Sequence, residues 1–464
     1  MCESIFLLSF LQICFIIKTY KIGIRKTWNK RKYNKEPCQY DYVIFREGRQ
    51  MTETPRIDKY SIIPDAEINI EKHFERLHHN PYTIETLFDG NPGWPGDREG
   101  RALLAFLCHY HINGRRIPCM EQMMRALPDR TNPYLFFGDA PGEGQVNEQQ
   151  LSGHNWYLRG LCDYAITFHD PLALRALKST FENLYLPALP LYDDYPLERR
   201  QKGGAVDGNI YGSSHGWSLS TDIGCAFMCV DGVARYFALT RDDRARVFLE
   251  KVIDIFLHAD MVTRGFQTHT SLTCLRGILS FYETTRQKKY LQAVRREFDR
   301  YLRYGMTLTY ENFNWFGRED TWTEPCAVVD SLLLAVNLHR LTGELRYRTL
   351  ARRIWANGLQ FCQRDNGGAG TNKCVTIKQP VLRISDYEAP QCCTMRYAEA
   401  LLCFSQNKEL FSYDSLAPTV TESDGRQFLD DRLLVMTNGK VVPIFSGNRV
   451  ARAELEALEL KVLF

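Results

Sequence analysis

The sequence predicts an all-α (α/α)6 toroid of helical hairpins, followed by a short β-type C-terminal segment. From about residue 97, a polar start, an amphipathic helix, a Gly or Asp turn and a second helix follow one another repeatedly, and apolar helices alternate with charge-rich ones. The repeats start near Arg98, His154, Trp217, His269, Pro325 and Cys392. Their spacing of about 50 to 65 residues suits a helical hairpin with a long return loop.

The hairpin that begins at Pro325 shows the pattern clearly. Proline is suited to the first position of a helix, apolar residues follow at helical spacing, and Gly343 ends the run. A partner helix is predicted from about 346 to 361, with apolar residues on one face and arginines on the other. In a second hairpin, an apolar helix at 271–282 precedes a charge-rich helix at 290–304. Apolar inner helices and charged outer helices therefore alternate.

Five hairpins and a sixth inner helix predict a closed ring. An open helical array needs polar capping repeats at its ends, and the sequence does not show them. An open helical-repeat scaffold is the alternative. In a closed toroid, the starts of the inner helices converge on one end of the ring, so residues from distant repeats can meet there.

We expect the helical domain to occupy residues 51–405 and a β-type remnant to occupy residues 406–464. Within the remnant, Arg432 to Phe445 is typical of two short strands around Asn438-Gly439, a strong hairpin turn signal. The remnant is too short to form a whole sandwich, which raises the question of a truncated C-terminus.

Residues 1–50 are expected to be an N-terminal extension. The apolar stretch Ile5 to Ile17 is short for a membrane span, and it lacks the positive start and the cleavage site of a secretory signal. It is either a signal or anchor, or a non-native stretch ahead of Met51, and it gives no firm membrane signal. Fifteen irregularly spaced cysteines favour reduced thiols or metal ligation, and hence a cytoplasmic location.

The composition argues against binding of nucleic acids. A net charge of +3 over 464 residues is nearly neutral, and the basic residues do not gather with interleaved aromatics. The expected partner is a carbohydrate substrate, and a homodimer is left open.

Two cysteine clusters stand out, Thr323-Glu324-Pro325-Cys326 and Gln391-Cys392-Cys393-Thr394. Each lies at the predicted start of an inner helix, where the helix dipole lowers the pKa of a thiol. Three thiolates and one carboxylate would supply the four ligands that zinc prefers in a tetrahedral site. The spacing is not a standard zinc-finger pattern, and the alternative is that these cysteines are buried core residues.

The motifs Thr323-Glu324-Pro325-Cys326-Ala327 and Cys392-Cys393 resemble the signature of the glycoside hydrolase family 127 β-L-arabinofuranosidases. The similarity extends over roughly Glu71 to Phe404 and implies an (α/α)6 toroid followed by β-sandwich domains. It also implies a retaining mechanism in which a zinc-bound cysteine attacks the anomeric carbon. By motif position, the resemblance implies Cys392 as the nucleophile, and Glu324, Cys326, Cys392 and Cys393 as the ligands of Zn2+.

A retaining reaction also needs a general acid that then becomes the base. The resemblance implies a Glu shortly before the Glu-x-Cys motif, and the nearest match is Glu311. The match is imperfect, because Tyr310 stands where the family has Gly and the gap to Glu324 is shorter. Glu319 and Asp320 compete for the role, each with a solvated loop charge as the alternative.

Substrate contacts are expected at the same ends of the inner helices and beside the cysteine clusters. Sugar sites commonly combine an aromatic floor with hydrogen-bonding groups at the edge. The candidates are His154, Trp156, His215, His269, Trp322 and Tyr387. For each residue taken singly, a structural role is the alternative.

The sequence therefore predicts a zinc-dependent retaining glycoside hydrolase with a cysteine nucleophile, releasing non-reducing-end β-L-arabinofuranosyl residues. One alternative is a metal-independent six-hairpin glycosidase or lyase that works through carboxylates, His and Tyr. Another is a non-catalytic helical toroid with a structural zinc. Composition does not give the sugar or the linkage.

Overall fold

A computed structural model of the chain describes residues 68–88, 93–198, 208–379, 381–382, 385–412, 419–437, 440–443 and 460–462. All of these residues belong to one unit, Ile57–Phe464, so the C-terminal strands and the helices are parts of the same body. The predicted extension at residues 1–50 lies outside the described residues. Within the described residues, no helix is both long enough and apolar enough to cross a membrane.

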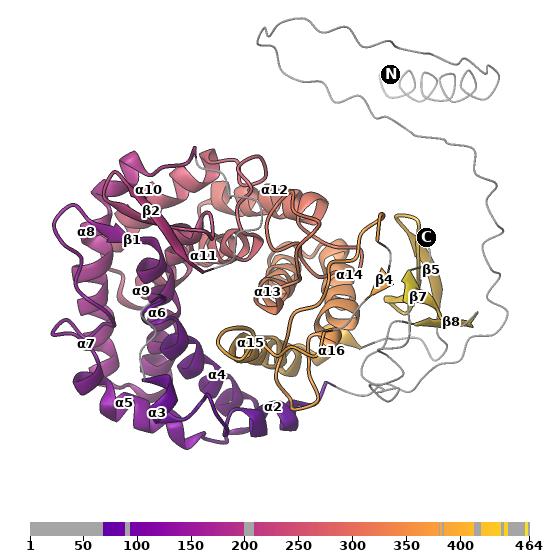
Figure 1. Cartoon of the computed structure of the whole chain (residues 1–464), viewed down its shortest axis with the longest axis horizontal. Coiled ribbons are helices and arrows are strands. Elements are labelled where there is room, and N and C mark those ends of the chain that lie inside the picture. Colours follow the sequence, from indigo (N-terminus) through magenta and orange to yellow (C-terminus); the bar gives the residue numbers. More distant parts are fainter. Residues whose placement is uncertain are drawn as a thin grey trace, which may run out of the picture. The chain divides into compact units, whose positions relative to one another are not determined.

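A ring of inner helices forms the core of this unit (Figure 1). The inner helices are α4 (Asp97–Asn113), α6 (Glu148–Phe168), α9 (Cys229–Thr240), α11 (Thr268–Thr285), α13 (Pro325–Thr342) and α15 (Cys393–Gln406). Each packs against the next in chain order, and α15 returns to pack against α4. This closure confirms the predicted toroid and is incompatible with an open helical array.

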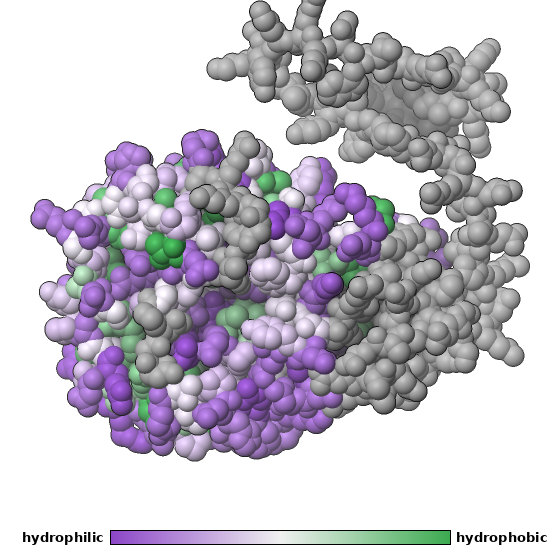
Figure 2. Space-filling model, viewed as in Figure 1, coloured by the Kyte–Doolittle hydropathy of each residue, from purple (hydrophilic) through white to green (hydrophobic). Residues whose placement is uncertain are grey.

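The outer helices alternate with the inner ones along the chain. They are α5 (Pro118–Arg130), α7 (Pro171–Thr180), α10 (Asp243–His258), α12 (Lys288–Tyr304) and α14 (Leu345–Arg353). The helical course of α14 continues through Ile354–Gly358 and Leu359–Phe361, as predicted for the partner of α13. Their outward faces carry the charged residues, and the face seen in Figure 2 is largely hydrophilic with small, separate hydrophobic patches.

Two of the predicted repeat starts are wrong. His154 lies inside α6, which begins at Glu148 after an Asn147 cap that accepts hydrogen bonds from two backbone N–H groups. Gly153 beside His154 serves close packing inside the helix, because an added Cβ would lie 2.2 Å from the carbonyl oxygen of Pro95. Trp217 begins a strand, and the inner helix of that repeat starts later, at Cys229.

A small sheet stands beside the starts of α6 and α9. It consists of β1 (Val146–Asn147), β3 (Trp217–Ser220) and β2 (Ile210–Ser214), in the order β1-β3-β2. The strand β1 runs directly into α6, and the antiparallel β2 and β3 form a hairpin. The sequence reasoning missed this sheet because its strands are short and partly polar.

The C-terminal strands form a second sheet. Its strands are β4 (Val381–Leu382), β9 (Leu460–Val462), β7 (Arg432–Thr437), β6 (Arg426–Leu429) and β5 (Val420–Ser423), with β8 (Lys440–Pro443) paired to β7. The antiparallel pairing of β7 with β8 confirms the two predicted strands. The buried Asn357 amide ties this sheet to the end of α14. It donates to the Asp431 carbonyl at 2.8 Å and accepts from the Leu433 N–H at 2.7 Å.

Three arginines and three carboxylates from the inner helices meet in a buried cluster, here called the inner charge network. It contains Arg159 of α6, Asp231 of α9, Arg276 of α11, Asp330 of α13, and Arg396 and Glu399 of α15. Arg276 lies 2.6 Å from Asp330 and 3.3 Å from Glu399, while Arg396 pairs with both carboxylates. Burial alone would raise the pKa of Asp330, but Arg396 and Arg276 hold it well below its usual range.

We expect Asp330→Asn to lower the free energy of unfolding by about 3–5 kcal/mol, because it leaves two buried guanidinium groups short of a counter-charge. Urea denaturation followed by circular dichroism measures the loss. The matched control is Glu250→Gln at the more exposed pair with Arg246, where a loss of at most about 0.5 kcal/mol is expected.

The pH dependence has a definite sign. The folded pKa of Asp330 is depressed, so its stabilising contribution is present above its unfolded pKa of about 4 and is lost as the pH falls below that value. Asp330→Asn should therefore reduce the gap between stability at neutral and acidic pH. Equal losses of unfolding free energy in Asp330→Asn and Glu250→Gln would contradict this account of the inner charge network.

Candidate metal centre

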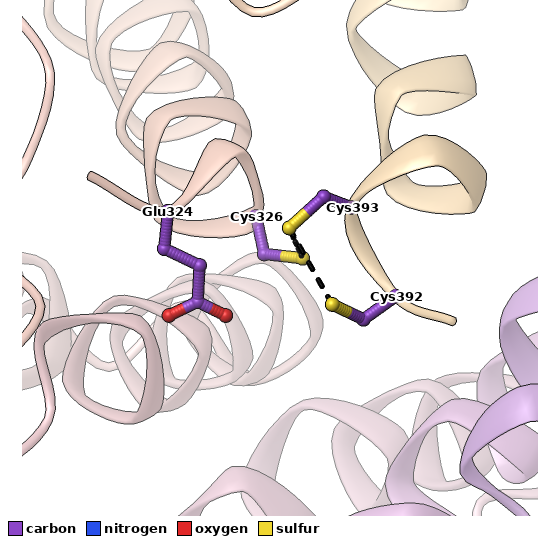
Figure 3. A group of neighbouring side chains, drawn as sticks. All are labelled: Glu324, Cys326, Cys392 and Cys393. Carbon is purple, nitrogen blue, oxygen red and sulfur yellow. Dashed lines mark hydrogen bonds between the residues drawn. The ribbon is translucent and has the colours of Figure 1, made fainter. Parts of the chain in front are cut away.

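The structure brings together the four residues that the sequence predicted as ligands. Glu324 and Cys392 are the residues immediately before α13 and α15, while Cys326 and Cys393 lie in the first turns of these helices. One ligand atom from each lies within 4.8 Å of all the others (Figure 3). The Cys393 sulfur is 3.6 Å from that of Cys326 and 3.4 Å from that of Cys392.

Neighbouring amides fix the position of Glu324. Its backbone N–H donates to the Asn312 side chain at 2.7 Å. With its amide oriented to satisfy both neighbours, Asn314 donates to a Glu324 carboxylate oxygen at 3.0 Å and accepts from the Trp322 indole at 3.1 Å. The loop before α13 therefore holds the carboxylate beside the sulfurs.

The three thiols differ in their surroundings. Cys326 and Cys393 are buried, whereas Cys392 is half-buried and is the least buried residue of the three. Hydrogen bonds with Cys326 and Cys393 lower the pKa of the Cys392 thiol. Hydrogen bonds with Cys326 and Cys392 raise the pKa of Cys393, and burial raises the pKa of Cys326. The arrangement thus favours the thiolate form at Cys392, the least buried cysteine of the three.

Trp156 and His269 are both buried, and both contact Arg101, which donates to the Cys326 sulfur. Their rings stack at a centroid distance of 5.6 Å, and the guanidinium group of Arg101 lies 4.0 Å from the Trp156 ring centroid. His269 Nδ1 donates to Asp330 at 2.8 Å. Both side chains are thus held by buried neighbours, and their predicted contact with a sugar stays a prediction.

The other predicted substrate contacts are scattered. His154 is buried with both ring nitrogens engaged, Nε2 accepting from the Phe137 N–H at 3.0 Å and Nδ1 donating to the Gln150 carbonyl at 2.8 Å. His215 is exposed in the turn between β2 and β3, with a φ of 48°. Tyr387 is also exposed. The half-buried Trp322 is the candidate that the Asn314 amide links to the centre.

Glu311 is fully buried and held by three donors. The Thr323 hydroxyl and the Asn372 amide donate to one carboxylate oxygen, and the Thr309 hydroxyl donates to the other, each at 3.0 Å. Burial raises the pKa of Glu311 to about 7. The competing carboxylates are exposed, with Glu319 paired to Lys378 and Asp320 paired to Arg318.

The sequence reasoning missed the residues that support the centre. Arg101, Asn312 and Asn314 contact the ligands, and Asn372 contacts Glu311. A usable signal existed for the one charged residue, Arg101, because an ionisable residue inside an inner helix needs a buried partner.

Comparisons with known proteins found similarity to solved structures in the path of the backbone. No family model and no curated protein matches the chain. A glycoside hydrolase family 127 β-L-arabinofuranosidase from Geobacillus stearothermophilus T6 is similar, with a TM-score of 0.48, 10% identity, and coverage of 79% of this chain and 69% of that chain. A second family 127 β-arabinofuranosidase has a TM-score of 0.45 and 10% identity, covering 79% of this chain and 61% of that chain. A cellobiose 2-epimerase from Spirochaeta thermophila has a TM-score of 0.41 and 14% identity, covering 70% of this chain and 88% of that chain.

We expect the raised pKa of Glu311 to give a pH-dependent loss of stability. The folded protein binds this proton more tightly than the unfolded chain does, so stability falls as the pH rises from 4.5 to about 7. Glu311→Gln should remove this pH dependence, which lowers the free energy of unfolding by on the order of 3 kcal/mol over that range. Urea denaturation at several pH values measures it. Glu319→Gln, at an exposed position, is the control that should keep the slope, and an unchanged slope in Glu311→Gln would refute the buried carboxyl as its source.

Proposed function

We propose that the chain is a zinc-dependent retaining glycoside hydrolase in which Cys392 is the nucleophile. The observation that carries the proposal is the cluster of three sulfurs and one carboxylate within 4.8 Å, in which Cys392 is the least buried of the three cysteines. Sulfur-rich, four-donor sets of this kind are typical of zinc.

The donor set fits a tetrahedral zinc ion. With Zn–S bonds of about 2.3 Å, tetrahedral geometry separates two sulfurs by roughly 3.8 Å. The sulfur separations of 3.4 and 3.6 Å are close to this value, and they are far longer than a disulfide bond of about 2.05 Å. Bound zinc would keep the Cys392 thiol deprotonated at neutral pH.

In the proposed reaction, the Cys392 sulfur attacks the anomeric carbon, a C–S bond forms and the glycosidic C–O bond breaks. The leaving oxygen takes a proton from a carboxylic acid. Water then attacks the same carbon, gives a proton to that carboxylate and displaces the sulfur. Two inversions retain the configuration. Helices α13 and α15 aim the sulfur by fixing its two neighbouring thiols.

Glu311 is our candidate for the acid and base. A pKa of about 7 keeps a large share of this carboxyl protonated near neutral pH, as an acid requires, and lets it serve as the base afterwards. Both carboxylate oxygens of Glu311 are buried and accept hydrogen bonds. The role therefore requires that the carboxyl become accessible to the leaving oxygen when substrate binds.

A β-L-arabinofuranosyl group at a non-reducing end is the proposed substrate. This choice rests on the resemblance of Thr323–Ala327 and of Cys392-Cys393 to the family 127 motifs. The surroundings of Trp322 are consistent with a sugar site, because a half-buried indole beside the metal ligands can offer its face to a ring.

A structural zinc site is the second candidate. Four protein ligands fill a tetrahedron and leave no open position, which is the usual arrangement where zinc serves stability alone. On this reading the protein would hold zinc without turning over any furanoside, and the ion would tie α13 to α15.

We expect purified protein to contain about one zinc ion per chain and to hydrolyse an aryl β-L-arabinofuranoside. Cys392→Ser should lower kcat/KM by roughly a thousandfold or more, since it removes the nucleophile. The control is Cys362→Ser, at a buried cysteine outside the cluster whose thiol donates to the Gly358 carbonyl, and it should keep most of the activity.

Metal analysis and hydrolysis of a panel of aryl furanosides separate the candidates. Zinc without turnover of any furanoside would favour the structural site. Turnover that survives chelation, together with an active Cys392→Ser, would favour a metal-independent glycosidase or lyase.

A further inference from the structure

Arg101 of α4 commits each of its three nitrogens to a different neighbour. Nε donates to both carboxylate oxygens of Asp97 at 2.9 Å, and Nη1 donates to the Cys326 sulfur at 3.5 Å. Nη2 donates to His269 Nε2 at 3.5 Å. The guanidinium group thus joins one of the proposed ligands to two buried polar groups.

The position of Arg101 is fixed from several sides. The group is buried, and its plane packs on the ring of Trp156, which is itself buried. His269, on the Nη2 side, is fixed in turn by its bond to Asp330 in the inner charge network. A guanidinium group held in this way has lost its mobility before any ligand binds, so its hydrogen bond to sulfur needs little reorganisation.

A loaded centre would carry excess negative charge. Three thiolates and a carboxylate outnumber the two positive charges of a divalent ion, so the buried centre is anionic overall. An N–H of a charged guanidinium group aimed at a thiolate stabilises that charge and restricts the direction of the sulfur. Arg101 can do both at Cys326.

Arg101 also adds a third helix to the centre. The four proposed ligands all come from the starts of α13 and α15, whereas Arg101 comes from α4. Because α15 closes the ring by packing on α4, this contact couples the metal centre to ring closure.

We propose that Arg101 is a positioning residue of the metal centre, which orients the Cys326 thiolate and stabilises the anionic charge of the loaded site. The inference rests on the proposed metal site. Lysine cannot replace Arg101, because a single ammonium group cannot reach Asp97, Cys326 and His269 in the planar geometry of the guanidinium fork.

The experiment uses the full chain loaded with Co2+ alone, whose sulfur-to-cobalt charge-transfer absorption reports the thiolate ligands, together with chelator competition for Zn2+. We expect Arg101→Lys to weaken zinc binding by about 10- to 100-fold and to shift the charge-transfer band. The double variant Asp97→Asn/Arg101→Gln removes the buried pair as a unit, so that no unpaired carboxylate is left, and the same two changes are expected.

Arg353→Gln is the matched control. It removes a largely buried arginine that pairs with Asp431 and lies outside both the inner charge network and the cluster of sulfurs. It should lower stability while leaving the cobalt spectrum and the zinc affinity as in wild type.

The outcomes are distinguishable. If wild type binds neither metal, both this inference and the proposed function are overturned. If wild type binds metal and both Arg101 variants match it, the positioning role is overturned while the proposed function stands. An equal change in Arg353→Gln would also overturn the role, since it would reflect loss of any buried arginine.

Discussion

The inner charge network is the constraint on which the rest of the structure depends. Five of the six inner helices contribute a charged group to it, and the sixth, α4, joins through the contact of Arg101 with His269, which binds Asp330. Charges buried in this way are costly unless each is paired, so the network penalises any arrangement of the helices other than the closed ring. The ring is thereby held in one register.

The register of the ring decides whether the four residues of the candidate metal centre can meet. Glu324 and Cys326 belong to one inner helix, and Cys392 and Cys393 to the next, so a shift between the two helices would separate the sulfurs. Asp330 and Arg396 lie one to two turns further along the same two helices and pair with each other. The ion pair fixes the relative position of the helix ends that carry the sulfurs.

Much of the fold could be predicted from the sequence because it depends on local patterns. Pro325 and Gly343 marked the ends of α13, and helical spacing of apolar residues marked α11 and α12. The predictions at His154 and Trp217 were wrong because small and aromatic residues serve helix packing and a strand there, and a single sequence does not separate these uses from a helix start.

The convergence of the two cysteine clusters was also predictable, since the ends of the inner helices must meet in a closed ring. The supporting contacts were not. Whether Trp156 and His269 face a sugar or a guanidinium group depends on the rotation of each helix about its axis, which periodicity fixes only to within a fraction of a turn. The same limit applies to Glu311, whose three donors come from separate segments.

The proposed chemistry depends on the sulfur of Cys392, because the other two cysteines of the cluster are buried. Rapid quenching during turnover of an aryl β-L-arabinofuranoside, followed by peptide mass spectrometry, tests it most directly. The account predicts one pentosyl group attached to the peptide that contains Cys392. Turnover without any adduct, or an adduct on a peptide that lacks Cys392, would contradict it.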